Sequence, residues 1–393
     1  MIKRYLKSLD YSLIIAITLL CTIGAVMVYS ASSIVAVMRY KSANLPSDYF
    51  FQEQVNAMIL GAFMFLLFSM LPYQIFRKRL FFIANIVISI GLLLLVMLMG
   101  EEANGAKSWL RIGGFKFQPA EFIKIGVIIF LAALYGRNQT IINRFWKGIV
   151  PPFMYVLVIF VLINMQPDLG TSLLILGTAC AMVFASGIDL KKIVTIALMV
   201  GIPVGTFLYF AYDKILSPHQ LNRFKVTSNP FDYAQDTGYQ LVHGFISITR
   251  GGFFGVGLGE STQKYGHLPE PHTDFIMAII AEELGFIGVS VILLGLAFVV
   301  FRGLMIARKC PDAFGSLLAI GISSMVAIQT TVNIGGLTGL MPLTGVPLPF
   351  ISYGGTSIVL LFISMGILMN IHRFSKARLA KKVNKNSPLE VVK

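Results

Sequence analysis

The chain has 393 residues, of which 56% are hydrophobic and 13% are charged, and its formal net charge is +14. A soluble protein typically carries roughly 25% charged residues, so this composition excludes an ordinary water-soluble domain. Nearly charge-free runs of about 20 residues recur along the chain, which matches the length needed to cross a bilayer. Such runs are too long for the strands of a membrane barrel, so the sequence predicts an all-α polytopic membrane protein.

About ten transmembrane helices are predicted from these runs. Their expected positions are residues 11–33, 55–71, 81–100, 119–136, 150–166, 170–186, 193–212, 272–300, 317–336 and 353–372. Together, residues 1–372 form a single transmembrane domain, and residues 373–393 form a basic tail.

The basic residues orient these helices. With both termini in the cytoplasm, roughly 21 of the 32 Lys and Arg residues lie inside, as the positive-inside rule requires. The positive charge is therefore mainly a topology signal, and because it is dispersed no nucleic-acid partner is expected. The tail is expected to contact anionic membrane lipids.

Two outer segments are too irregular to be simple turns. Residues 213–271 form a long extracellular loop between the seventh and eighth spans, and long loops are commonly functional. The stretch from Tyr239 to Leu258 has two open interpretations, a helix on the membrane surface or a re-entrant element. The Pro- and Gly-rich residues 337–354 are expected to form a structured loop that lines a cavity.

Charged residues in or beside the membrane are costly, so each is a functional hypothesis. Glu121 and Lys124 share one helical face, either as a functional pair or as a structural ion pair that locks helices together. Asp168 precedes a predicted helix and suits an N-cap. Asp274 opens the eighth span and has two interpretations, a helix cap or a catalytic carboxylate.

Four further residues are candidates. Glu282 and Glu283 lie about two turns below Asp274 and point to different faces, so at most one of them readily faces a given cavity. Trp109 and Arg111 lie in the outer loop before Glu121, where Trp109 suits either an aromatic anchor or a substrate contact.

Several motifs resemble those of one family. These are GVGLGESTQKYGHLPEPHTDFIMAIIAEELGFIG at 255–288, PLTGVPLPFISYGGTS at 342–357, NGAKSWL at 104–110, FQPAE at 117–121 and QPDLGT at 166–171. The chain is thereby similar to the SEDS family, the FtsW, RodA and SpoVE group, over nearly its whole length. The GLGESTQK and LPEPHTD elements are more similar to the division-type FtsW branch than to the elongation-type RodA branch.

This resemblance implies a peptidoglycan glycosyltransferase that polymerises lipid II into a nascent glycan strand on the outer face of the cytoplasmic membrane. It implies a class B penicillin-binding protein, a transpeptidase, as partner, together with other divisome proteins at the septum. A role in elongation, a lipid II flippase and a non-catalytic divisome scaffold are the alternatives. The flippase is disfavoured because the elaborate segments all lie on one side, whereas a carrier needs gates on both.

The resemblance also assigns roles to matching residues. Asp274 is the expected catalytic carboxylate, with His272 and Thr273 of the same signature beside the substrate. Trp109 is expected near the substrate, and Glu121 and Lys124 in the cavity wall. Some division-type relatives carry Lys where this chain has Thr344, so no cationic contact is implied there.

The chemistry requires a base for the attacking hydroxyl and positive charge for the departing pyrophosphate. Asp274 is the expected base, and burial is expected to raise its pKa. Arg223, Arg250 and Lys124 are the favoured cations, while Arg111 and Glu282 are further candidates for substrate binding. A Mg²⁺ or Mn²⁺ ion held partly by Asp274 is a further possibility, and no organic cofactor is expected.

Overall fold

The computed structural model describes residues 2–39, 46–103, 106–112, 115–137, 139, 142–189, 191–192, 194–195, 223 and 225–386. Nine long helices dominate this part of the chain: α2 (Tyr11–Arg39), α3 (Tyr49–Met70), α4 (Arg79–Met99), α5 (Pro119–Arg137), α6 (Val150–Asn164), α7 (Leu169–Ala185), α11 (Ile276–Lys309), α12 (Ala313–Leu337) and α13 (Gly355–Asn386). Shorter helices are α1 (Ile2–Lys7), η2 (Tyr73–Arg77), η3 (Phe145–Ile149), η4 (Pro230–Tyr233) and α10 (Tyr239–Gly251).

The described helices confirm the predicted polytopic bundle. Eight of them are long and apolar enough to cross a membrane, and the shorter apolar α7 makes a ninth. The predicted span 193–212 falls almost entirely outside the described residues. The largest differences from the predicted boundaries are at the ends of α11 and α13. α11 begins at Ile276 and continues to Lys309, and α13 continues to Asn386, so the first part of the predicted tail is helical.

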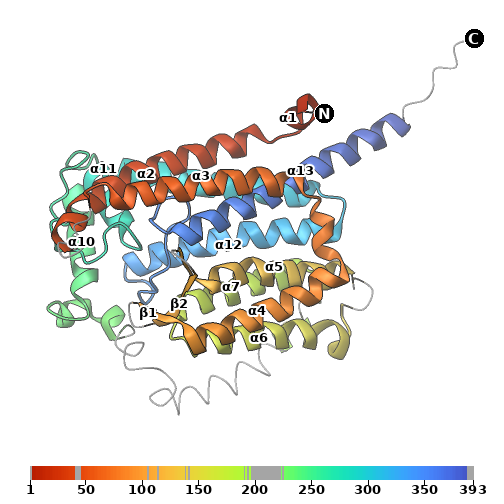
Figure 1. Cartoon of the computed structure of the whole chain (residues 1–393), viewed down its shortest axis with the longest axis horizontal. Coiled ribbons are helices and arrows are strands. Elements are labelled where there is room, and N and C mark those ends of the chain that lie inside the picture. The colour runs from red at the N-terminus through yellow and green to blue at the C-terminus, as the bar shows by residue number, and fades with distance from the viewer. Residues whose placement is uncertain are drawn as a thin grey trace, which may run out of the picture.

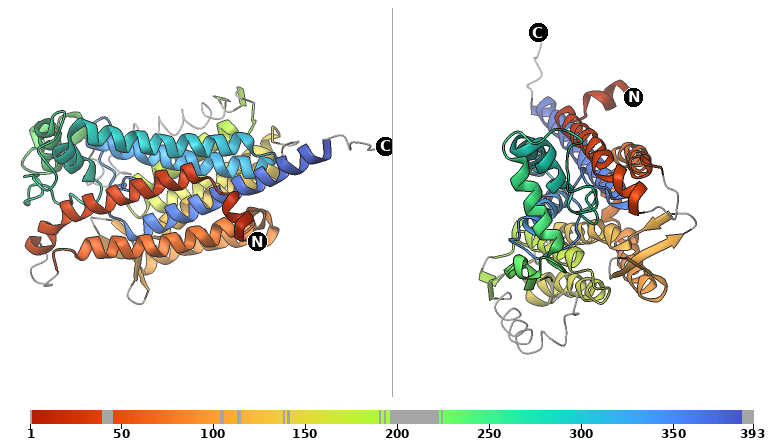
Figure 2. Two further views of the ribbon diagram at one scale, coloured as in Figure 1. Left: turned by 90° about the horizontal axis from the view of Figure 1, so that it is seen from above. Right: turned by 90° about the vertical axis from the view of Figure 1, so that its left-hand side faces the viewer.

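The helices run roughly parallel to one long axis (Figure 1). α5 and α12 lie at the centre and are mostly buried, whereas α3 and α4 keep most of their apolar side chains exposed, as lipid-facing helices do. α1 and the last turns of α13 lie at one end of the bundle, and α10 lies at the opposite end (Figures 1 and 2). This separation agrees with cytoplasmic termini and an outer face formed by the long loop.

A small antiparallel sheet was not predicted. It has the order β1 (Glu101–Ala103), β2 (Ala106–Ile112) and β3 (Phe115–Phe117), and lies at the edge of the bundle beside α4 (Figure 2). The sequence carried a signal for it, since Asn-Gly and Gly-Gly pairs at 104–105 and 113–114 are typical of hairpin turns. The predicted outer loop that contains Trp109 thus forms this sheet, with Trp109 on β2.

Helix α11 is broken near its outer end at Gly285, whose φ is +64° and ψ is −164°. The segment after α10 fills the break: Val256 N donates to Glu282 O (2.9 Å), and Phe286 N donates to Gly252 O (3.0 Å). Hydrogen bonds of this kind satisfy backbone groups that the break removes from the helix. The segment is therefore built into the bundle, which supports the re-entrant interpretation over a helix that merely lies on the membrane.

The residues between α12 and α13 are non-helical, as predicted from their Pro and Gly content. Three amide side chains hold this loop. Gln329 donates to Pro347 O (2.8 Å), Asn333 donates to Val346 O (2.8 Å), and Gln54 donates to Ser352 O (3.1 Å). These buried amides supply the hydrogen bonds that water supplies to an exposed loop.

The break in α11 predicts a strict requirement for glycine at position 285. In Gly285→Ala the added Cβ would overlap Gly255 N and Phe253 O, and the residue would occupy a strained backbone region. We expect a loss of roughly 2 kcal/mol or more in the free energy of unfolding. Gly91→Ala is the control, since nothing lies near its Cβ. Equal thermal unfolding of the two variants in detergent would contradict this account.

Candidate functional site at the outer end

Asp274 lies in the turn that leads into α11, at the outer end of the bundle. Its side chain is half-buried, and Oδ1 accepts a hydrogen bond from Thr273 Oγ1 (3.1 Å). Its backbone oxygen accepts from Asn333 Nδ2 (2.9 Å), which ties the turn to α12. In the described structure Phe275 is the N-cap of α11, and no side chain caps this helix. The carboxylate is thus held in place without serving as a helix cap.

The environment of Asp274 favours its protonated form. Burial is the main cause and raises the pKa of its carboxyl to about 6, with a smaller push from the negative charge of Glu270. The hydrogen bond from Thr273 and the positive charge of Arg223 act in the opposite direction and lower the pKa. A carboxyl with a pKa close to the ambient pH can take a proton from a hydroxyl and later release it.

Arg223 brings positive charge to this carboxylate. It lies within electrostatic range of both Asp274 and Asp168, and Nη1 donates to Leu343 O (2.8 Å). Asp168 caps α7, as predicted, by accepting from Thr171 N (3.0 Å), and it also accepts from Gln118 Nε2 (2.8 Å). Burial raises the pKa of Asp168. Among the predicted cations, the structure therefore brings Arg223 toward Asp274.

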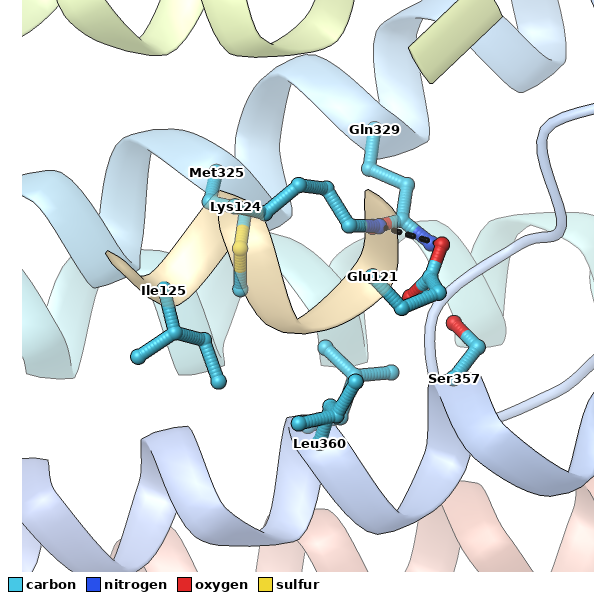
Figure 3. A pocket seen from close by; sticks show the side chains of 8 residues that line it. Glu121, Lys124, Ile125, Met325, Gln329, Ser357 and Leu360 are labelled. Atoms are coloured by element: carbon cyan, nitrogen blue, oxygen red, sulfur yellow. Dashed lines mark hydrogen bonds and ion pairs between the residues drawn. The ribbon is translucent and has the colours of Figure 1, made fainter. Parts of the chain in front are cut away.

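Glu121 and Lys124 form a buried ion pair on α5. The Nζ–Oε1 distance is 2.7 Å, and the two side chains are 6% and 4% exposed. Lys124 also reaches Gln329 Oε1 at 3.5 Å. The pair lines a small cavity with Ser357 of α13 (Figure 3). The cavity is small and has room for about one water molecule.

A second polar cluster anchors the outer loop to the break in α11. Glu283 accepts from Lys264 Nζ (2.9 Å) and from Ser30 Oγ (2.8 Å). Glu282 accepts from Ser261 Oγ (2.5 Å) and from Thr262 N (2.9 Å).

The arrangement of these two glutamates differs from the expectation that they face different sides. Both carboxylates are fully buried and bind the same loop, residues 261–264. Arg250 Nη1 lies 3.5 Å from Glu282 Oε1 and also donates a hydrogen bond to Thr262 Oγ1. These contacts give Glu282 and Arg250 a structural role, and their predicted contacts with substrate stay predictions.

The remaining predicted residues lie in two different settings. His272 is buried against Phe50 (ring centroids 4.4 Å apart), and its backbone oxygen accepts from Tyr353 N (2.9 Å). Trp109 is half-buried on β2 opposite Glu101. Arg111 on the same strand pairs with Glu101 Oε1 at 2.9 Å. His272 thus supports the turn that carries Asp274, whereas Trp109 and Arg111 belong to the small sheet.

The amides Asn333, Gln329 and Gln54 were missed by the sequence analysis. They are uncharged residues within long apolar helices, so the search for intramembrane charges passed over them. Their signal was polarity at one helical face, since Gln329 and Asn333 are four residues apart on α12.

The described residues contain no group of three His, Cys, Asp or Glu side chains able to hold a metal ion. A divalent cation at Asp274 would therefore need most of its ligands from a bound phosphate and from water, which is a common arrangement for Mg²⁺.

Fold and site together define a polytopic membrane protein whose outer face carries a carboxylate with a raised pKa and a neighbouring arginine. Residues 11–377 match the sequence model of the FtsW, RodA and SpoVE family of cell cycle proteins. The chain is 49% identical over 392 residues to the probable peptidoglycan glycosyltransferase FtsW of Bacillus subtilis (strain 168), covering 99% of this chain and 96% of that protein. This chain therefore belongs to the FtsW, RodA and SpoVE family.

Two further comparisons agree. Stage V sporulation protein E of Bacillus subtilis (strain 168) is 38% identical over 369 residues, which cover 93% of this chain and 98% of that protein. A solved structure is described as the structural coordination of polymerization and crosslinking by a peptidoglycan synthase complex. One of its chains has a TM-score of 0.77 and 26% identity to this chain, and the match covers 93% of this chain and 98% of that one.

The Glu121–Lys124 pair offers a test that separates packing from function. Lys124→Met leaves a buried carboxylate uncompensated, and we expect a loss of roughly 3–5 kcal/mol in the free energy of unfolding. The double variant Glu121→Gln/Lys124→Met removes both charges and should recover most of that loss.

Thermal unfolding in detergent checks the stability of both variants, and an assay of glycan polymerisation checks their activity. A stable but inactive double variant supports a functional pair. A stable and active one would contradict the predicted contact with substrate.

Proposed function

We propose that this protein is a peptidoglycan glycosyltransferase that polymerises lipid II on the outer face of the cytoplasmic membrane, in the division-type branch of its family. One observation carries the proposal: Asp274, at the outer end of the bundle, has a pKa raised to about 6 and lies near Arg223. The 49% identity to a protein named probable peptidoglycan glycosyltransferase FtsW supports both the activity and the branch.

Asp274 acts as the general base. The GlcNAc 4-hydroxyl of one lipid-linked sugar attacks the anomeric carbon of MurNAc on another, and Asp274 takes the hydroxyl proton as the new glycosidic bond forms. The bond to undecaprenyl pyrophosphate breaks at the same carbon, and the pyrophosphate leaves with the bonding electrons. Attack from the face opposite the leaving group converts an α-linked donor into a β-linked glycan.

Arg223 is suited to stabilise the charge that develops on the pyrophosphate, because it shares the neighbourhood of Asp274. A Mg²⁺ or Mn²⁺ ion bound by Asp274 and the pyrophosphate would supply further positive charge.

A class B penicillin-binding protein is the proposed partner, and the division septum is the proposed site of action. The partner is supported by the fold shared with a chain of a peptidoglycan synthase complex in which polymerization and crosslinking are coordinated. Crosslinking is the reaction of a transpeptidase. The septal location rests on similarity to the division-type relative.

Loss of the Asp274 carboxylate is the direct test of this proposal. Asp274→Asn should lower the rate of polymerisation by at least about 100-fold, because general-base catalysis typically contributes that much or more. The assay follows glycan chains made from labelled lipid II in liposomes that contain the protein and its partner transpeptidase. Asp232→Asn, at an exposed carboxylate in the same long loop, is the matched control and should keep full activity.

The same liposomes separate the enzyme from a transporter. If the wild-type protein moves lipid II between leaflets but forms no glycan, the glycosyltransferase proposal fails and the flippase replaces it.

The pKa of Asp274 predicts how activity depends on pH. A general base works in its deprotonated form, so the rate should rise with pH around a midpoint of about 6. Thr273→Val removes a hydrogen bond that lowers the pKa and should move the midpoint to higher pH. Glu270→Gln removes a negative charge that raises the pKa and should move it to lower pH. Midpoints that move in the same direction, or that do not move, would contradict Asp274 as the base.

A further inference from the structure

A short apolar segment of the outer loop carries no charged side chain. Residues 252–259 read Gly-Phe-Phe-Gly-Val-Gly-Leu-Gly, between Arg250 and Glu260. We call this segment the outer apolar loop. Its four large side chains are exposed, with exposed fractions of 58% for Phe253, 79% for Phe254, 36% for Val256 and 57% for Leu258. None of the chemistry above uses them.

Part of the backbone of the outer apolar loop is hydrogen-bonded within the protein. Gly255 N donates to Gly251 O (2.8 Å), and Gly257 N donates to Glu283 O (3.1 Å). The carbonyl oxygens of Gly252 and Phe253 accept from Phe286 N (3.0 Å) and Ile287 N (3.3 Å). These bonds fix the loop to α11 and pair part of its polar backbone, which lowers the cost of placing it at the edge of the hydrocarbon layer.

Helix α11 sets the depth of this loop. After the break, the helix rises roughly 33 Å between Phe286 and Arg308 at 1.5 Å per residue, which is close to the roughly 30 Å thickness of the hydrocarbon core. With Arg308 at the inner interface, Phe286 lies at the outer boundary of the hydrocarbon. The loop hydrogen-bonds to Phe286 and Ile287 and therefore lies at that same depth.

The apolar surface is continuous from this loop into the lipid-facing side of α11. The ring of Phe253 stacks on Phe286, with centroids 5.6 Å apart and planes 25° apart. Exposed apolar side chains continue down α11 at helical spacing, at Phe286, Val291, Leu294, Phe298 and Phe301.

We propose that the outer apolar loop inserts into the outer leaflet and anchors the long loop to the membrane, with phospholipid acyl chains packed against Phe253 and Phe254. Lipid is favoured over a protein partner because the segment lacks charge and extends the exposed apolar stripe of α11. The loop also meets α11 where Glu282 and Glu283 hold residues 261–264, so the anchor sets the depth of the turn that follows. The proposal is independent of the chemistry at Asp274.

Depth-dependent quenching tests the insertion. Phe254→Cys is made in a chain whose Cys21, Cys180 and Cys310 are replaced by alanine, then labelled with a small fluorophore and reconstituted without a partner. The nanodiscs contain phosphatidylethanolamine, phosphatidylglycerol and a lipid with a nitroxide near the headgroup end of one acyl chain. Leu294→Cys is the lipid-facing control, and Tyr265→Cys is the control for an exposed outer-loop residue outside the segment.

The expected result is quenching at position 254 by the nitroxide lipid at least as strong as at position 294, which lies deeper in the hydrocarbon, with little quenching of either label by aqueous iodide. Position 265 should show the reverse. Quenching at position 254 by iodide and not by the lipid would overturn the proposal. Protection of that label from iodide by an added partner transpeptidase would then identify a protein-binding surface instead. Because residue 254 packs against little of the bundle, unchanged thermal unfolding of each labelled chain confirms that the fold is kept.

Discussion

Backbone that leaves helical geometry inside a membrane protein must find its hydrogen bonds within the protein, because hydrocarbon supplies none. Within the part of the chain that the structure describes, the break in α11 at Gly285 and the non-helical loop between α12 and α13 face that constraint. The first is satisfied by the backbone of the outer loop, and the second by buried amides such as Gln329 and Asn333. These two sets of hydrogen bonds determine how the outer half of the molecule is arranged.

The position of Asp274 follows from both of them. Asn333 donates to the backbone oxygens of Asp274 and Val346, so one amide joins the turn that carries Asp274 to the irregular loop. On the other side, Glu282 and Glu283 bind residues 261–264 and tie the long loop to α11. The carboxylate is thus held from two directions, and the burial that accompanies this packing raises its pKa. The same packing therefore holds the turn in place and raises the pKa of Asp274.

The sequence predicted the parts that depend on composition and on local signals. Hydropathy located the described helices, and the position of Asp168 before an apolar run predicted its N-cap, which the Thr171 N–H confirms. The same local reasoning allowed a cap at Asp274, where the structure has none, because a carboxylate before a helix has the same sequence signature in both cases. The common loop bound by Glu282 and Glu283 could not be predicted, since it depends on a break in the helix and on contacts across about 20 residues of chain.

The two ends of the bundle differ in the contacts that hold their helices together. At the end that carries the termini, direct ion pairs join the helices: Arg302 contacts Asp10 at 2.5 Å, and Arg77 contacts Asp312 at 3.6 Å. Asn370 adds a bond to Ser69 O (2.7 Å), which links α13 to α3. A carrier that alternates its access must open this end in every cycle and break such contacts. An enzyme that works on the outer face has no need to do so, and its inner end can remain closed throughout the reaction proposed for Asp274.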